Sequence, residues 1–192
     1  LDIYDTLRLF EEMKPRYIVN IIQDLVIDDA VDIMLALDDE ERTGYLKLMD
    51  PVHREKLVAM FQYKEDSAGS IMTIEYIEID VDDSVEQAMK ELLKQAVDAE
   101  MINTLYVTDS KNTLVGTLSL REMILARKGQ FIKDIMNSRI VSVKTSMDQE
   151  DVAEIFKDYD FTSLPVVDKL GRMLGIITID DIIDVIEEEA SE

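Results

Sequence analysis

Residues 164–181, LPVVDKLGRMLGIITIDD, have the pattern of two short strands that are joined by a turn and lead directly into a helix. Residues 105–122, LYVTDSKNTLVGTLSLRE, repeat this pattern, with apolar residues, turn residues and a glycine in matching places. The repeat continues upstream, since the tripeptide Ile-Met-Thr at 71–73 returns as Ile-Met-Asn at 135–137. A β-rich stretch and an amphipathic helix follow each tripeptide. The sequence therefore predicts two copies of a βαββα unit.

The chain before the repeats has a different pattern of apolar residues, and residues 1–62 are predicted to form helices only. Apolar residues recur there at helical spacing, as in 30–37, and Pro51 directly after Asp50 is typical of a helix start. Short helices separated by tight acidic turns indicate part of a helical-repeat array. The predicted fold class is α+β, and the domains expected are a partial helical domain over 1–62, a hinge over 63–70, a first repeat over 71–134, and a second repeat with the start of a connecting helix over 135–192.

The composition limits the classes of molecule that can be binding partners of the chain. The 192 residues include 42 Asp and Glu against 20 Lys and Arg, so the formal net charge is −22. Such a surface repels the phosphate backbone, which argues against nucleic acid and favours a cationic partner such as a metal ion. The alternative is that the charge only keeps the protein in solution. The absence of cysteine excludes disulfides, zinc–thiolate sites and thiol nucleophiles.

The chain resembles a known family at two places. The pattern shared by 105–122 and 164–181 resembles a tandem pair of cystathionine-β-synthase (CBS) domains. The junction YKEDSAGSIMT, residues 63–73, and the stretch DYDFTSLPVVD, residues 158–168, resemble the MgtE magnesium transporters. This resemblance implies a Mg²⁺-sensing regulatory region on the cytoplasmic side of the cell membrane, joined to its own transmembrane domain. It further implies a homodimer formed through the CBS pair. The chain reads as a piece of a longer protein, because no apolar run approaches the roughly 20 residues of a membrane span.

The resemblance also implies the metal ligands. The helical block would contribute Asp28 and Asp32, which are four residues apart on one helical face, and the last helix Asp181 and Asp184. From the residues alone, these four carboxylates are better explained as helix-terminal or solvated groups, and only the resemblance favours metal ligands. Further positions that match metal-site neighbourhoods of the family, or the end nearest the membrane, are Ser70 through its backbone, Glu150 with Asp148, Asp160 after Tyr159, and Glu189 with Glu192.

An adenine nucleotide such as ATP is the other expected ligand. In CBS domains the turn S/T-x-x-D often holds a ribose, and it occurs here as Ser119 to Glu122 and as Thr178 to Asp181. The alternative explanation is a capping box at the start of each helix. Glu122 departs from the usual Asp. The resemblance places Arg121 and Phe161 near the nucleotide, with the purine stacked on Phe161.

The sequence gives little support for an enzyme. His53 is the single histidine and has no predicted partner, and there is neither a Walker A loop nor a nucleophile elbow. The function expected is therefore a regulatory domain that becomes compact when Mg²⁺ binds. The alternative is an adenine-nucleotide-sensing CBS module whose acidity is incidental.

Overall fold

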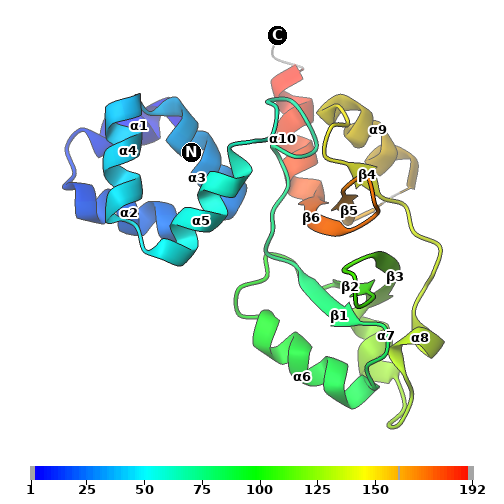
Figure 1. Ribbon diagram of the computed structural model, residues 1–192. Coiled ribbons are helices and arrows are strands. Elements are labelled where there is room, and N and C mark those ends of the chain that lie inside the picture. The colour runs from blue at the N-terminus through cyan, green and yellow to red at the C-terminus, as the bar shows by residue number, and fades with distance from the viewer. Residues whose placement is uncertain (1–2, 160, 190–192) are drawn as a thin grey trace. The chain divides into compact units, whose positions relative to one another are not determined.

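The computed structural model describes residues 3–159 and 161–189, and the chain divides into two compact units at Tyr63/Lys64. Each unit has the architecture that the sequence predicts: helices only in the first unit, and two small sheets with helices in the second (Figure 1). The predicted α+β class is confirmed.

The first unit is an array of short helices whose starts are fixed by local chemistry. Its helices are α1 Ile3–Phe10, α2 Pro15–Asp24, α3 Ile27–Ala36, α4 Asp39–Leu48 and α5 Pro51–Met60. The Asp38 carboxylate caps α4 by accepting from the Glu41 backbone N–H at 2.8 Å. The Asp50 carboxylate caps α5, with Pro51 in the first turn. The core that these helices enclose is aliphatic and includes Ile18, Val19, Ile22, Ala30, Val31, Met34, Leu57 and Met60.

Arg42 closes the turn between α3 and α4. Its guanidinium donates to the carbonyls of Met34 at 2.6 Å, Leu35 at 3.0 Å and Leu37 at 2.7 Å. It also donates to the Asp39 carboxylate at 2.9 Å. These carbonyls belong to the last turn of α3 and the residue after it, where the helix itself provides no donors and where its dipole favours a cation.

The second unit contains the predicted repeat. Each copy forms a three-stranded sheet in which the first strand is parallel and the third antiparallel to the central one. The first sheet consists of β1 Ile77–Asp80, β2 Thr104–Thr108 and β3 Leu114–Ser119, and the second of β4 Val143–Lys144, β5 Ser163–Val167 and β6 Met173–Thr178. The helices are α6 Val85–Gln95, α7 Leu120–Leu125, α8 Ile132–Ile135, α9 Gln149–Tyr159 and α10 Ile179–Glu189.

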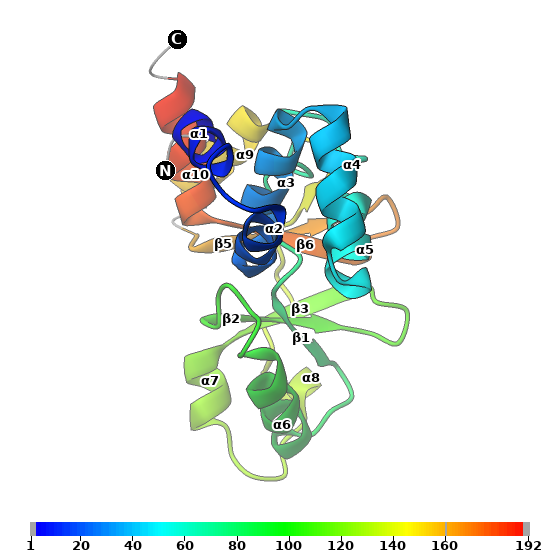
Figure 2. The ribbon, with the colours of Figure 1, turned by 90° about the vertical axis from the view of Figure 1, so that its left-hand side faces the viewer.

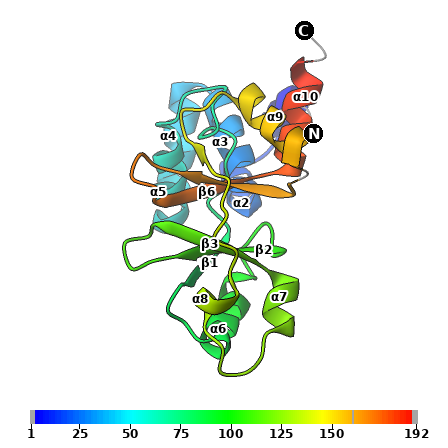
Figure 3. The same cartoon turned by 90° about the vertical axis from the view of Figure 1, so that its right-hand side faces the viewer.

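The two sheets of this unit pack face to face, with the helices on the outer sides (Figure 2 and Figure 3). Tyr106 from β2 is fully buried against Val167, Met173 and Ile176 of the second copy. Its hydroxyl shares a 2.8 Å hydrogen bond with the Ser163 hydroxyl, which satisfies both groups inside the apolar interface. This burial and the loss of hydration raise the pKa of Tyr106 to about 12.

The two copies also exchange their leading tripeptides. Thr73, ahead of the first sheet, pairs with Ile176 of the second through backbone hydrogen bonds of 2.8 and 2.9 Å. Asn137, ahead of the second sheet, pairs with Thr117 of the first at 2.8 and 2.9 Å. Each tripeptide therefore adds to the sheet of the other copy.

A methionine and a glycine make this exchange possible. A Cβ on Gly175 would lie 2.9 Å from the Met72 sulfur, and one on Gly116 would lie 2.5 Å from the Met136 sulfur. Only a residue without a side chain lets the methionine of the other copy come so close. The repeated Met and the repeated Gly in the sequence are thus the two halves of one contact.

Candidate functional site

The segment predicted as a hinge is largely docked on the second CBS copy. The Ala68 N–H donates to the Met147 carbonyl at 2.7 Å, and the Gly69 N–H donates to the Thr145 carbonyl at 3.0 Å. Ser67 and Ala68 are buried, at 4% and 0% exposed. The small side chains of Ser67 and Ala68 allow this close packing within the predicted hinge.

This docking brings two groups of predicted metal-site residues together. The Ser70 hydroxyl donates to the Ser67 carbonyl at 2.8 Å, which closes the turn. Beside it, the Gln149 N–H donates to the Asp66 carbonyl at 3.1 Å, and the Glu150 N–H donates to the Asp148 carboxylate at 3.0 Å at the start of α9. The junction therefore gathers backbone carbonyls and carboxylates, the hard oxygen donors that Mg²⁺ prefers.

The acidic residues of α10 lie at its start. The Asp181 carboxylate accepts from the Thr178 N–H and hydroxyl, both at 2.8 Å. Asp184 is exposed one turn further along. Ile182 and Val185 of the same helix are buried against the rest of the second copy. This packing fixes the helix, with Asp181 partly buried beside the apolar residues and Asp184 exposed.

The acidic residues of the first unit follow the same principle. Asp28 is in the first turn of α3 and is half-buried, and Asp32 is exposed one turn later. Ala30, Val31, Ile33 and Met34 bury the remaining sides of this helix. The two carboxylates thus share one edge of α3.

Asp160, the remaining predicted metal residue, lies outside the described part of the chain. So do Glu192 and the side chain of Glu189, which were predicted at the end nearest the membrane. Within residues 3–159 and 161–189, no three Asp, Glu or His side chains gather closely enough to hold a metal ion.

The first predicted nucleotide turn is a capping box. The Glu122 carboxylate accepts from the Ser119 N–H at 2.8 Å and from the Ser119 hydroxyl at 2.7 Å, through the same oxygen. These two hydrogen bonds lower the pKa of Glu122, so the group is a carboxylate at neutral pH. Arg121, the residue directly before Glu122, is exposed. The capping function and a ribose-binding function are compatible, since both need a fixed carboxylate.

The second copy of the repeat contains a pair of stacked aromatic residues between α9 and β5. Tyr159 ends α9, and Phe161 lies two residues before β5. Their rings are stacked, with centroids 5.4 Å apart and planes inclined by 16°. Tyr159 is 60% exposed, whereas Phe161 is half-buried.

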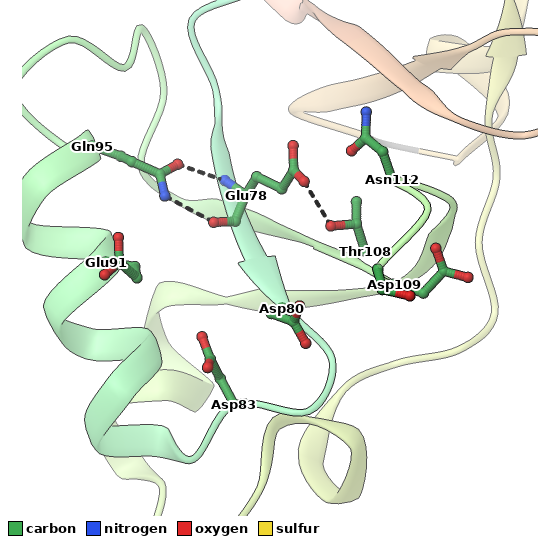
Figure 4. Close-up of a pocket in the computed structure, with 9 residues that line it drawn as sticks. Glu78, Asp80, Asp83, Glu91, Gln95, Thr108, Asp109 and Asn112 are labelled. Atoms are coloured by element: carbon green, nitrogen blue, oxygen red, sulfur yellow. Dashed lines mark hydrogen bonds between the residues drawn. The ribbon is translucent and has the colours of Figure 1, made fainter.

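An acidic hollow of about 660 Å³ on the first copy has no counterpart among the sequence predictions. Glu78, Asp80, Asp83, Glu91 and Asp109 surround it together with four uncharged residues (Figure 4): Gln95, Thr108, Ser110 and Asn112. These acids come from a strand, a turn, a helix and a hairpin, and no spacing in the sequence links them.

Three pKa values are shifted in and beside the hollow, and that of Asp109 is lowered by hydrogen bonds from the backbone N–H groups of Thr113 and Lys111. Burial raises the pKa of Asp83, and the nearby carboxylates of Asp80 and Glu91 raise it further. Glu78 is held by the Thr108 hydroxyl at 2.7 Å, and its charge, after burial, raises the pKa of the Tyr76 phenol. The hollow is therefore strongly negative.

His53 has a partner, contrary to the sequence prediction. Its Nδ1 contacts the Asp50 carboxylate at the start of α5, and both side chains are about half exposed. Asp50 already caps the helix, so this contact belongs to a helix start.

The comparisons with known proteins divide the chain as the fold does. Residues 1–66 match the MgtE intracellular N domain, and residues 68–129 and 132–188 each match the CBS domain. The crystal structure of the soluble part of a magnesium transporter is 41% identical and has a TM-score of 0.90, covering 94% of this chain and 70% of that one. The chain belongs to the MgtE family. The resemblance seen in residues 63–73 and in the repeats is confirmed.

Two further MgtE relatives bear on the ligands. The cytosolic domain of the Mg²⁺ channel MgtE, solved in complex with ATP, is 39% identical, with a TM-score of 0.92 over 96% of this chain and 76% of that one. Magnesium transporter MgtE of Thermus thermophilus is 43% identical over 169 residues, which are 86% of this chain and 38% of the relative. The chain thus spans less than two-fifths of that relative's length.

The enzymes that the chain resembles are matched over only a small share of their own length. Inosine-5'-monophosphate dehydrogenase of Nitrosopumilus maritimus is 32% identical over 119 residues, 62% of this chain but only 24% of the enzyme. The families matched here are regulatory and transporter families. In the part of the chain that the structure describes, no helix has both the length and the apolar character to cross a bilayer.

Proposed function

We propose that this chain is a Mg²⁺-sensing regulatory region that gates a magnesium transporter, on the cytoplasmic side of the membrane and joined there to its own transmembrane domain. The observation that carries the proposal is the match of 94% of the chain to the soluble part of a magnesium transporter. The carboxylates support it: each unit presents an acidic pair on one edge of a helix, Asp28 with Asp32 and Asp181 with Asp184.

Electrostatics provides the mechanism. When the two units approach, two facing carboxylates about 5 Å apart repel each other by roughly 3 kcal/mol at an effective dielectric constant near 20. Mg²⁺ between them removes this repulsion and supplies oxygen coordination in its place. The unit-to-unit contact therefore forms when Mg²⁺ is plentiful, and in the intact transporter this compact state closes the pore.

The free energy needed to shift the equilibrium between the open and compact states determines how many ions must bind. One site at ten times its Kd contributes only about 1.4 kcal/mol. A switch from 1:99 to 99:1 requires about 5.5 kcal/mol. About four ions must therefore act together, which accounts for ligands spread over both units, namely Asp28, Asp32, Asp181 and Asp184 with Ser70, Glu150 and Asp160.

Small-angle scattering during a Mg²⁺ titration tests this mechanism. The unmodified chain is expected to show a falling radius of gyration, together with protection of the connection near Tyr63 from protease. The double variant Asp28→Asn, Asp181→Asn keeps the side-chain shapes but removes two charges, so it should be intermediate in size and lose the Mg²⁺ response.

A matched double variant controls for net charge. Asp24→Asn with Asp134→Asn also removes one exposed carboxylate from each unit, and it should compact at the same Mg²⁺ concentration as the unmodified chain. If the Asp28 and Asp181 variant compacts there too, these carboxylates are not the sensor, and a solvated acidic surface is the better explanation.

ATP is a second proposed ligand, supported by the relative that was solved in complex with ATP. In this chain the carboxylate of Glu122 is fixed by Ser119, and Arg121 beside it offers a charge for phosphates. Calorimetry should detect ATP binding that Arg121→Ala weakens and Arg127→Ala, the loss of another exposed arginine, does not. Failure of the unmodified chain to bind ATP would remove this ligand.

A further inference from the structure

Thr178 is the last residue of β6 and lies directly before α10, the helix that carries the predicted ligands Asp181 and Asp184. Its backbone N–H and its hydroxyl both donate to the same oxygen of the Asp181 carboxylate, each at 2.8 Å. Two donors on one oxygen fix the direction of the carboxylate as well as its position. A residue of the sheet therefore orients an acid of the helix.

The donor itself is held rigidly. Thr178 is only 1% exposed, and it pairs across the sheet with Ser163, which is also buried. The Ser163 hydroxyl is in turn hydrogen-bonded to that of Tyr106 from the first copy. Because threonine is branched at Cβ, its methyl group restricts rotation about χ1, and close packing restricts this rotation further. The packing therefore helps to aim the hydroxyl at Asp181.

A helix start alone could also require these hydrogen bonds, and α6 provides the comparison. Ser84 and Gln87 form a capping box there, in which the Gln87 N–H donates to the Ser84 hydroxyl oxygen at 3.3 Å. Ser84 is more exposed than Thr178, and the side chain of its partner is an uncharged amide. The start of α6 is thus a matched example that includes no predicted metal ligand.

We propose that Thr178 is a positioning residue for Mg²⁺, which acts by holding the Asp181 carboxylate in the orientation that the ion requires. This inference rests on the proposed function, in which Asp181 is a metal ligand. Residues that hydrogen-bond to metal ligands fix their geometry, and the loss of such a residue typically weakens metal binding by about 10- to 100-fold. Thr178 therefore helps to determine how tightly the site at α10 binds Mg²⁺.

Small-angle scattering during a Mg²⁺ titration measures the effect of Thr178→Val, which removes the hydroxyl and keeps the shape. When about four ions act together, a loss of about 10- to 100-fold at one site raises the Mg²⁺ concentration at the midpoint of compaction by the fourth root of that factor, about two- to threefold. Thr178→Ser keeps the hydroxyl and should restore the original midpoint. Ser84→Ala removes the cap of α6 and should leave the midpoint unchanged.

The dependence on Asp181 separates positioning from a purely structural function. In the Asp181→Asn background, Thr178→Val should cause no further shift of the midpoint, because the carboxylate through which Thr178 acts is absent. Thermal melts without Mg²⁺ show whether each variant is folded at the temperature of the titration. If Thr178→Val does not fold, Thr178→Cys, which has a similar size and only a weak donor, replaces it and should also raise the midpoint.

The inference is overturned if the variant at Thr178 has the midpoint of the unmodified chain, or if it shifts the midpoint equally with and without the Asp181 carboxylate. Either result would assign Thr178 to helix capping alone and would leave the proposed function intact. If the unmodified chain does not compact with Mg²⁺, the proposed function fails and this assignment fails with it.

Discussion

At the scale of single residues, Arg42 joins the end of α3 to the start of α4 in the helical unit. One planar guanidinium satisfies the carbonyls of Met34, Leu35 and Leu37, which have no other donors in the helix geometry. Its fork of donors is what makes three simultaneous contacts possible.

Arg42→Ala is expected to lower the free energy of unfolding by about 1–3 kcal/mol, because partly buried carbonyls lose charged donors. Arg42→Lys should recover only part of this loss, since an ammonium cannot reach all three carbonyls. Urea unfolding followed by circular dichroism measures both. Arg16→Ala removes an exposed arginine of α2 as a control, and equal effects of the two alanine variants would contradict this function of Arg42.

Asp83 predicts a pH dependence of stability. Its pKa in the folded protein is raised by burial and by the neighbouring carboxylates, so the folded state binds the proton more tightly than the unfolded state does. The charged form therefore costs stability, and this cost appears as the pH rises through the raised pKa.

Asp83→Asn is expected to raise the melting temperature at neutral pH. The free energy of unfolding should rise by less than about 1 kcal/mol. The gain should shrink as the pH is lowered toward the ordinary pKa of an aspartate, where Asp83 itself becomes neutral. Thermal melts from pH 7 to pH 4 measure this difference, with the exposed Asp98→Asn as a control. A gain that does not depend on pH would indicate a cause other than charge.

The residues that could be predicted from sequence are those whose partners are near in the chain. Asp38, Asp50 and Ser119 cap helices through residues two or three positions away, and a local pattern is sufficient to recognise them. Asp80 is also near Asp83 in the chain, but Glu78 and Asp109, which line the same hollow, lie far apart in the sequence and only the fold brings them together. The acidic hollow could not be predicted for the same reason.

At the scale of elements, the close approach of Met72 to Gly175 joins a leading tripeptide to the sheet of the other copy. A Cβ on Gly175 would lie 2.6 Å from the Thr73 carbonyl oxygen, a backbone atom that cannot move alone. Gly175→Ala is therefore expected to destabilise the protein by about 1–3 kcal/mol through overpacking. Urea unfolding measures the change.

Two other glycines provide graded controls for that variant. In Gly116→Ala the nearest atoms belong to the side chain of Met136, which can shift, so the loss should be smaller. In Gly44→Ala nothing lies within 4 Å, and the helix should gain about 0.5–1 kcal/mol. If all three substitutions have the same effect, close approach is not what these positions require.

The repeat and its elements could be predicted because the hydrophobic period and the turn residues recur in both copies. The exchange of tripeptides could not, since the same pattern would also suit a tripeptide that pairs within its own copy. The docking of Ser67 to Gly69 on the second copy was missed for a related reason: small residues are typical both of hinges and of close packing.

At the scale of the whole molecule, the exposed apolar residues of the first CBS copy favour the predicted homodimer. Leu93 and Val97, on and just after α6, are 65% and 84% exposed, and Ile124 and Leu125 on α7 are 64% and 70% exposed. Apolar side chains that are this exposed on two outer helices are expected where an assembly covers the surface.

Analytical ultracentrifugation at tens of micromolar should therefore give a dimer mass, with and without Mg²⁺. The variant Val97→Glu, Leu125→Glu should weaken the dimer at least tenfold, because two charges would be buried without partners. Leu170→Glu, a substitution of a 73% exposed leucine in the second copy, should have no effect. A monomer in the unmodified chain would refute the predicted assembly.

The exchanged tripeptides mean that neither copy of the repeat is a self-sufficient object. Residues 71–73 precede the first copy in the chain but complete the second, and 135–137 precede the second but complete the first. A domain boundary placed by the order of the chain therefore differs from one placed by the sheet with which each tripeptide pairs. One copy on its own would have an unpaired sheet edge and a leading tripeptide with no strand to pair with. A second molecule of the same copy would provide the missing partner for both.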